Sequence, residues 1–176
     1  MRLVDAARCP FCARVRLALG EKGVEYEQVA IDLANRPAWL VDMNPAGKVP
    51  VLDDGFPLPE SAVIMEYLEE RFPEPALLPA VTAARARARL AVFRFDELLG
   101  DDYYAMRRGE PNRLSERLEE LPVGESLFVD FAFLPWVLRL RHLYATTLPR
   151  RLEEWLERLA GRAAVAAEIA LVRSLA

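Results

Sequence analysis

Two cysteines separated by two residues are the side chains of this sequence best suited to chemistry. Cys9-Pro10-Phe11-Cys12 follows a short strand-like run and opens a run with helical spacing. Free backbone N–H groups at a helix N-terminus stabilise an anion, and the nearby Arg8 and Arg14 add positive charge, so Cys9 is expected to be a thiolate nucleophile. Cys12 lies about one turn deeper and could close a disulfide with Cys9. The motif predicts thiol–disulfide chemistry, with metal binding or two buried structural thiols as the alternatives.

Two other segments carry groups suited to bind a ligand. Lys48, Val49 and Pro50 close a tight loop, and a cis Val49–Pro50 bond would turn the Val49 backbone toward a ligand. Ser61 is typical of a helix N-cap, where free N–H groups receive a carboxylate, and Glu60 beside it could accept an ammonium group. Each segment alone is explained as simply by an ordinary trans proline, or by an ordinary cap with a solvated acid.

The elements that must position these groups alternate between strand and helix in the first part of the chain. Periodicity and turn residues predict strands over residues 2–6, 25–31, 49–52 and 56–58, and helices over residues 9–19, 37–43 and 61–72. The order β-α-β-α-β-β-α is an α/β architecture. Pro73, Pro75 and Pro79 then form a linker, because proline lacks the N–H that a helix needs.

The second part of the chain has helical patterns only, which predicts an all-α bundle. Thr82 is expected to cap a long helix that runs to about residue 108, and further helices are expected over residues 112–121, 128–144, 148–159 and 162–175. We therefore expect two domains, an α/β domain over residues 1–75 and an all-α domain over residues 82–176.

The composition excludes several other classes of protein. Hydrophobic residues make up 53% of the 176 residues, enough to bury a sizeable core. The net charge of −4 argues against a general nucleic-acid binder, which needs a basic surface. Two cysteines and one histidine cannot by themselves complete a four-ligand zinc site, so no metal is expected. No run is apolar and long enough for a signal peptide or a membrane span, so we expect a cytoplasmic protein.

The three motifs together resemble the N-terminal thioredoxin-like domain of glutathione S-transferases, in particular the cysteine-type members of the omega and glutaredoxin-like groups. The matching segments are residues 9–12, 44–52 and 60–70, in the family's order and spacing over residues 1–79. Gly124-Glu125 and the segment from Asp130 to Trp136 resemble that family's folding motif in the central helix of the bundle. The resemblance implies a thioredoxin-like domain followed by a shortened all-α domain, glutathione as co-substrate, and a twofold homodimer.

The resemblance also implies a role for each matching residue. Cys9 would face the glutathione sulfur, and Val49, before a cis Pro50, would pair with the cysteinyl backbone of glutathione. Glu60 and Ser61 would hold its γ-glutamyl end. The residues expected to bind glutathione are Phe11, Arg36, Lys48, Val49, Pro50, Glu60 and Ser61.

Two further positions match the family less closely. Arg36 stands where related cysteine-type members carry a Lys, and it could reach the glycyl carboxylate; a solvated cation is the alternative. Asp130 would satisfy N–H groups at a helix start, but Leu127 stands where the family usually has Ser or Thr, and Glu125 replaces the more usual Asp. The chain is also shorter than most members, so the second-substrate pocket that the helices build is expected to differ.

The second substrate is expected between the two domains, where ligand sites concentrate. Tyr103, Tyr104 and Met106 are the expected pocket residues, with Phe11 and Phe93 as further candidates for its walls. Packing between helices is the simpler interpretation for any one of them. Tyr103 and Tyr104 look least like core residues, because two aspartates precede them.

A cysteine at the key position favours thiol transfer, because it can form a mixed disulfide with glutathione, whereas Tyr or Ser only polarises the glutathione thiol. We expect a glutathione-dependent thiol transferase or reductase. In this reaction Cys9 attacks a mixed disulfide and releases the reduced substrate, and a second glutathione or Cys12 then restores Cys9.

Two other functions stay open. Residues 17–24 and 64–73 also resemble the stringent starvation protein A branch of the same superfamily, which implies a non-enzymatic adaptor that binds RNA polymerase. The intact Cys9-Pro10-Phe11-Cys12 motif favours the enzyme, since an adaptor does not need it. A glutathione-dependent conjugating transferase, isomerase or dehalogenase could use the same scaffold, and no residue selects it.

Overall fold

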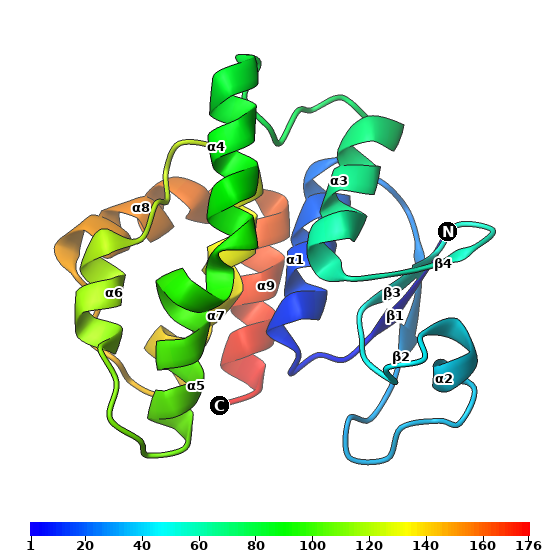
Figure 1. Cartoon of the computed structure of the whole chain (residues 1–176), viewed down its shortest axis with the longest axis horizontal. Helices are drawn as coiled ribbons and strands as arrows, with labels where there is room; N and C mark the ends of the chain where they lie inside the picture. The colour runs from blue at the N-terminus through cyan, green and yellow to red at the C-terminus, as the bar shows by residue number, and fades with distance from the viewer.

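A four-stranded mixed sheet forms the first part of the computed structural model, which describes all 176 residues (Figure 1). Its strands are β1 (Arg2–Asp5), β2 (Glu27–Ala30), β3 (Val51–Asp53) and β4 (Pro57–Pro59), in the spatial order β2-β1-β3-β4. β2 runs parallel to β1, whereas β3 is antiparallel to both β1 and β4. The parallel strands β1 and β2 are joined through α1 (Pro10–Glu21), because parallel strands need a long crossover connection. The antiparallel strands β3 and β4 are joined through a short turn.

The helices of this part cover both faces of the sheet. Leu3 and Leu52 face α1 (Pro10–Glu21) and α3 (Ser61–Arg71), whereas Val4 and Val51 lie on the opposite face with α2 (Leu40–Met43). Adjacent strand residues point to opposite faces, which explains why neighbours in sequence belong to different clusters. The observed order confirms the predicted β-α-β-α-β-β-α succession.

The predicted short helix over residues 37–43 begins later than expected. The N–H groups of Leu40, Val41 and Asp42 each donate to the carbonyl three residues earlier, so residues 37–39 form tight turns before α2 starts. Bonds of this spacing wind the backbone more tightly than an α-helix does.

The second part is helical throughout, as predicted. Its elements are α4 (Thr82–Phe93), a π-helical turn η1 (Asp96–Gly100), α5 (Asp101–Arg107), α6 (Leu114–Glu120), α7 (Leu127–Leu143), α8 (Arg150–Ala160) and α9 (Ala163–Ser174). Residues 72–81 between α3 and α4 form neither helix nor strand. The division into domains over residues 1–75 and 82–176 stays a prediction.

The predicted single helix over residues 82–108 is wrong, because the π-helical turn interrupts it. Gly100 lies so close to Asp96 and Phe95 that an added Cβ would come within 2.6 and 2.8 Å of their side chains. The wider turn thus packs both side chains against a residue that has none. Thr82 is also not a cap: it is the first helical residue, and no side chain caps the helix at Val81.

The central helix α7 is buried along most of its length and is tied down at its start. Ser126 precedes it, and its hydroxyl oxygen accepts from the Val129 N–H. Asp130 accepts from the Gly124 N–H at 2.6 Å and from the Trp155 indole N–H of α8 at 2.9 Å. A serine cap is therefore present. It stands at position 126, one residue before position 127, where the family usually has Ser or Thr and this chain has Leu127.

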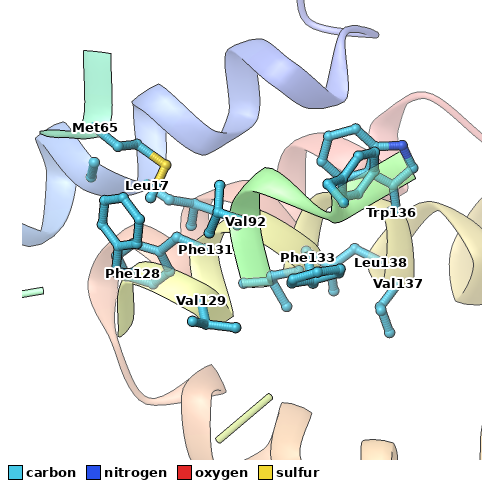
Figure 2. Packing of buried hydrophobic residues seen from close by; sticks show 14 of the residues in the cluster. Leu17, Met65, Val92, Phe128, Val129, Phe131, Phe133, Trp136, Val137 and Leu138 are labelled. Carbon is cyan, nitrogen blue, oxygen red and sulfur yellow. The ribbon is translucent and has the colours of Figure 1, made fainter. Parts of the chain in front are cut away.

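One continuous core joins the sheet to the helical bundle. Figure 2 shows Leu17 of α1 and Met65 of α3 beside Phe128 and Phe131 of α7, and all four are buried. α1 packs against α3 on one side and against α7 and α9 on the other, so the helix that follows the first strand is the element shared by both parts (Figure 1). No helix combines the length and the apolar character needed to cross a membrane.

Candidate active site

Cys9 stands at the N-terminus of α1, in extended conformation, with Pro10 as the first helical residue. Proline suits that position because its missing N–H would have had no helical partner. The Cys9 N–H donates to the Ala6 carbonyl at 2.8 Å, which fixes the turn after β1. Both cysteines are free thiols, and Cys9 keeps 8% of its surface exposed whereas Cys12 is fully buried.

The two thiols have opposite acidities. The Cys12 thiol donates a hydrogen bond to the Cys9 sulfur, and although burial opposes the charge, this bond lowers the pKa of Cys9 from 9.0 to about 7, with help from the Cys12 and Phe11 N–H groups and the Arg139 charge. Burial, followed by the bond to Cys9, raises the pKa of Cys12 far above its usual range. Negative charge therefore collects on Cys9, as expected for a sulfur at a helix N-terminus.

A groove of about 120 Å³ lies beside this turn, and all of the expected glutathione-binding residues except Arg36 line it. The lining residues are Phe11, Asn44, Lys48, Val49, Pro50, Glu60 and Ser61. The Cys9 Sγ lies 3.8 Å from the Val49 carbonyl oxygen, so the nucleophile adjoins the groove. Segments some forty and fifty residues apart in the chain therefore meet at one place.

The loop that carries Lys48 and Val49 is held by Asn44, which sequence reasoning did not assign to the site. Asn44 is buried; its amide N–H donates to the Lys48 carbonyl at 2.8 Å, and its amide oxygen accepts from the Ala46 N–H at 3.1 Å. Gly47 has a φ of +58°, a conformation that glycine adopts most readily. The Val49–Pro50 bond is cis, as the family resemblance implied. The only signal for Asn44 was its place at the start of the loop motif.

The start of α3 differs by one residue from the prediction. Ser61 is the first helical residue and Glu60 is the N-cap, because the Glu60 carbonyl accepts the first helical bond from Ile64 N–H at 2.9 Å. Glu60 has a φ of +70°, which strains a residue with a side chain. Strained backbone of this kind is typical of binding and active sites, where the surrounding structure holds it in place.

Arg14 is buried beneath the groove and ties α1 to α3 and α7. Its guanidinium donates to the Ser61 hydroxyl at 3.3 Å and to the Ala132 carbonyl at 2.9 Å. Its charged end also lies over the rings of Phe95 and Trp136, 4.4 and 4.6 Å from their centres. Burial lowers the pKa of Arg14 to about 9. Sequence reasoning assigned Arg14 only a contribution to the local charge.

Arg36 does not line the groove. It is exposed and donates to the Leu33 carbonyl at 3.3 Å and to the Gly47 carbonyl at 2.9 Å. The bond to Gly47 places it against the outside of the loop that carries Lys48.

The aromatic residues expected to line a second-substrate pocket fall into different environments. Tyr103 is 1% exposed and packs within the main core against the rings of Tyr104 and Tyr144, so the expectation that it avoids the core is wrong. The two preceding aspartates mark the solvent side of α5, and Tyr103 occupies its inner side. Met106 is half-buried and packs against the same core.

Tyr104 lies near enough to Cys9 and Arg14 for their charges to affect its phenol. It is half-buried, and burial raises the pKa of its phenol. The charge of Cys9 also raises this pKa, whereas a hydrogen bond with Trp136 and the charge of Arg14 lower it.

Phe93 is not a wall of the site, because 88% of its surface is exposed. Phe95, two residues later and beyond the end of α4, packs instead against Phe11, with ring centres 6.0 Å apart. Phe11 also meets the Trp136 ring at 4.9 Å. The end of the helix thus decides which of the two phenylalanines points inward.

The molecule holds no metal-binding cluster, and a second hollow lies away from the thiols. No group of three or more His, Cys, Asp or Glu side chains lies close enough together to hold a metal ion. This second hollow, of about 310 Å³, lies under α2 on the far face of the sheet and is lined by Arg2, Val4, Val29, Trp39, Asp42 and Met43. None of these residues carries a thiol or a hydroxyl group.

Comparison with known proteins shows which family shares these motifs. Residues 3–76 match the family model of the glutathione S-transferase N-terminal domain. Pyrimidodiazepine synthase of Drosophila melanogaster is 34% identical over 185 aligned positions, covering 90% of this chain and 76% of that protein. Glutathione S-transferase omega-1 of Mus musculus is 31% identical over 81% of this chain and 68% of its own length. A stringent starvation protein A homolog of Haemophilus influenzae is 32% identical, over 85% of this chain and 80% of its own length.

Solved structures agree with the sequence relatives. Rice GST1 in complex with glutathione superposes with a TM-score of 0.78 at 27% identity, covering 99% of this chain and 95% of that one. Glutathione transferase Omega 3C of Trametes versicolor superposes with a TM-score of 0.76 at 26% identity, covering 95% and 87%.

Proposed function

The chain belongs to the glutathione S-transferase family, and from that membership we propose that it is a glutathione-dependent thiol transferase or reductase. The observation that carries the proposal is the Cys9 sulfur, whose pKa is lowered to about 7 at the N-terminus of α1 and which lies 3.8 Å from the Val49 carbonyl of the groove. A sulfur anion in that place can form a disulfide with glutathione, which a hydroxyl cannot do.

The chemistry of the groove supports glutathione as the co-substrate. Glutathione carries one ammonium and two carboxylates. The Glu60 carboxylate suits the ammonium, and the Ser61 hydroxyl with the free N–H groups of α3 suits the γ-glutamyl carboxylate. Lys48 lines the groove, and Arg36 lies on the outer side of the same loop, so both are proposed to attract the glycyl carboxylate. The Val49 backbone is proposed to pair with the cysteinyl unit.

The proposed reaction consists of two thiol–disulfide exchanges. The Cys9 thiolate attacks the glutathionyl sulfur of a mixed disulfide; a Cys9–glutathione disulfide forms, and the substrate leaves as a thiolate that takes a proton from water. A second glutathione thiolate then attacks the glutathionyl sulfur, which releases glutathione disulfide and restores the Cys9 thiolate. The two steps need no external oxidant or reductant, because each breaks one S–S bond and forms another.

The environment of Cys12 favours glutathione over Cys12 for the second exchange. Cys12 is fully buried, and burial raises its pKa, so it is a poor attacking thiol. We propose that its main role is to donate a hydrogen bond to the Cys9 thiolate.

A glutathione-linked thiol-transfer assay of Cys9→Ser and Cys12→Ser tests the proposal. Cys9→Ser is expected to lose activity about a hundredfold or more, because a hydroxyl cannot form the covalent intermediate. Cys12→Ser is expected to keep most of its activity, and mass spectrometry is expected to find glutathione attached to its Cys9. Activity that survives Cys9→Ser would eliminate the mechanism, and loss in Cys12→Ser alone would exchange the roles of the two thiols.

An adaptor function is the second candidate, because a relative named for stringent starvation protein A spans most of this chain. The intact motif and the groove beside it favour the enzyme. Calorimetric titration with reduced glutathione separates the two: binding supports the enzyme, and no binding at millimolar concentration supports an adaptor that binds RNA polymerase. A conjugating or isomerising activity would show as glutathione-dependent turnover of an electrophile that survives Cys9→Ser.

A further inference from the structure

A buried network of charged side chains lies behind the turn that carries Cys9 and connects four elements. Arg16 of α1 donates to Asp5 of β1 at 2.6 Å and to Glu168 of α9 at 2.8 Å. Arg139 of α7 donates to the other oxygen of Glu168 at 3.5 Å. Asp5, Arg139 and Glu168 are each at most 2% exposed.

Arg139 reaches from this network to the nucleophile's own turn. Its guanidinium donates to the carbonyl of Ala7 at 3.2 Å, to that of Arg8 at 3.4 Å and to that of Pro135 in its own helix at 2.9 Å. Ala7 and Arg8 are the two residues before Cys9. The planar, multiply donating guanidinium can hold several carbonyls at once, whereas an ammonium on a flexible stem cannot reproduce that geometry.

The last helix holds the other side of this arrangement. α9 packs closely against α1, since a Cβ added to Gly20 would come within 2.9 Å of the Ala164 Cβ. The Arg8 side chain donates to the Leu175 carbonyl at 3.3 Å, just beyond the end of α9. The final helix of the chain therefore contacts both the helix and the turn that flank Cys9.

Stability alone does not explain such a network. Ion pairs taken out of water rarely contribute more than apolar residues of the same volume would, because desolvation cancels most of their attraction. The network lies where the direction of two carbonyls decides how the next residue enters α1. The charge of Arg139 also helps to lower the pKa of Cys9.

We propose that Arg139, anchored by Glu168 of the last helix, is a positioning residue that clamps the Ala7 and Arg8 carbonyls and so holds Cys9 at the N-terminus of α1 beside the groove. The proposal deepens the function proposed above, because it takes Cys9 as the nucleophile.

The test measures the rate of Cys9 alkylation by iodoacetamide against pH, with mass spectrometry to confirm the modified residue. This readout needs no glutathione, so it is separate from the transfer assay. The groups that face Cys9 are Cys12 and Arg14 of α1, Tyr104 of α5 and Arg139 of α7, with Asp5, Arg16 and Glu168 behind them. The variants are Arg139→Gln, Arg139→Lys and Glu168→Gln. Glu69→Gln is the matched control, because it breaks a buried pair with Lys22 (2.8 Å) that makes no contact with Cys9.

The alkylation midpoint is the pH at which the alkylation rate reaches half its maximum. Both Arg139 variants are expected to raise this midpoint by about one pH unit, which lowers the rate at pH 7 about fivefold. Arg139→Lys keeps the charge, so full rescue by lysine would overturn the clamp and leave only a charge effect. Glu168→Gln is expected to raise the midpoint too, because Arg139 loses its anchor. Removing a negative charge near a thiolate would by itself lower the midpoint, so an unchanged or lower midpoint overturns the role of Glu168.

The outcomes for the two proposals are distinguishable. A shifted midpoint in the Arg139 and Glu168 variants, with none in Glu69→Gln, supports the clamp even if the wild-type protein transfers no glutathione. A transfer assay that succeeds while all four variants keep the wild-type midpoint supports the proposed function and overturns the clamp.

Discussion

Cys9 and Cys12 lie one helical turn apart but have opposite environments. Cys9 is the last residue before α1 and receives N–H groups from the first turn, whereas Cys12 is enclosed by apolar side chains. Charge on one therefore depends on a proton held by the other. This pairing explains how two chemically identical side chains acquire different roles.

The hydrogen bond from Cys12 predicts how the acidity of Cys9 responds to substitution. Alkylation of the wild-type protein is expected to be half-maximal near pH 7, since the rate rises as Cys9 loses its proton. Cys12→Ala removes the donor and is expected to raise the midpoint by about one unit, whereas Cys12→Ser keeps a donor and falls between. A midpoint near 7 in Cys12→Ala would show that the bond has no effect.

Substitution of the strained Glu60 is expected to change stability little and to weaken glutathione binding. Glu60→Gly relieves a φ of +70° but adds freedom to the unfolded chain, so the free energy of unfolding is expected to change by less than about 1 kcal/mol. Glutathione affinity is expected to fall about tenfold, because the carboxylate proposed to bind the ammonium group is lost. Urea unfolding and calorimetry measure the two quantities. Glu60→Gln separates charge from strain, and undiminished affinity in both variants would remove Glu60 from the site.

Residues with a motif signal were predictable from the sequence, and buried polar residues without one were not. The groove residues Phe11, Lys48, Val49, Glu60 and Ser61 belong to three recognisable segments. Arg14 and Arg139 were not assigned their positions, because an arginine on a helix is usually solvated and the sequence does not reveal which one is enclosed. Only the packing of helices from distant parts of the chain buries them.

At the scale of elements, the start of α7 depends on one carboxylate. Asp130→Ala would leave the Gly124 N–H and the Trp155 indole N–H without their acceptor inside the protein. The expected loss is about 2–4 kcal/mol of unfolding free energy, because a buried donor without a partner costs about 1–3 kcal/mol, and the N–H of the exposed Gly124 costs less since water can reach it. Asp130→Asn keeps one acceptor oxygen and is expected to lose less. Urea unfolding tests the order; equal losses for both variants would contradict it.

The close contact of α1 and α9 predicts opposite effects for two glycine substitutions. Gly20→Ala would place a Cβ 2.9 Å from the Ala164 Cβ and is expected to destabilise the protein by about 1–2 kcal/mol, despite the better helix propensity of alanine. Gly161→Ala meets no atom within 4 Å and is expected to be neutral or slightly stabilising. Thermal unfolding of both variants decides; a Gly20→Ala protein as stable as Gly161→Ala would show that the helices separate freely.

The elements themselves were predicted better than their ends. Every predicted strand and helix of the α/β part is present, because the period of the apolar residues and the turn residues agree there. The helix predicted over residues 82–108 is interrupted, because its apolar pattern continues through η1 and only the packing of Asp96 and Phe95 on Gly100 changes the winding. Side-chain periodicity cannot report an extra residue in one turn.

At the scale of the molecule, exposed apolar side chains support the dimer implied by the family resemblance. Leu90 and Phe93 of α4, Val63 of α3 and Phe56 in the turn before β4 are each about half exposed or more. Such side chains are expected to be covered where the first part of one subunit meets the helices of the other.

Sedimentation of the wild-type protein is therefore expected to give about twice the monomer mass of 19.9 kDa. Phe93→Ser is expected to shift the equilibrium toward the monomer, because it removes the most exposed aromatic side chain of α4. Val41→Ser on α2 is the control, since it changes an exposed apolar residue of the sheet part away from α4 (Figure 1). A monomer at every concentration, or equal association of the two variants, would contradict the prediction.

The contacts of α9 with α1 and with the turn before Cys9 also have a consequence for the order of events during synthesis. Translation delivers Cys9 well over a hundred residues before Glu168 and Leu175, which contact its surroundings in the folded protein. A nascent chain can therefore form the sheet long before α9 completes the contacts that surround Cys9. Variants that lack α9 are accordingly expected to have a less reactive Cys9 thiol while the sheet stays intact.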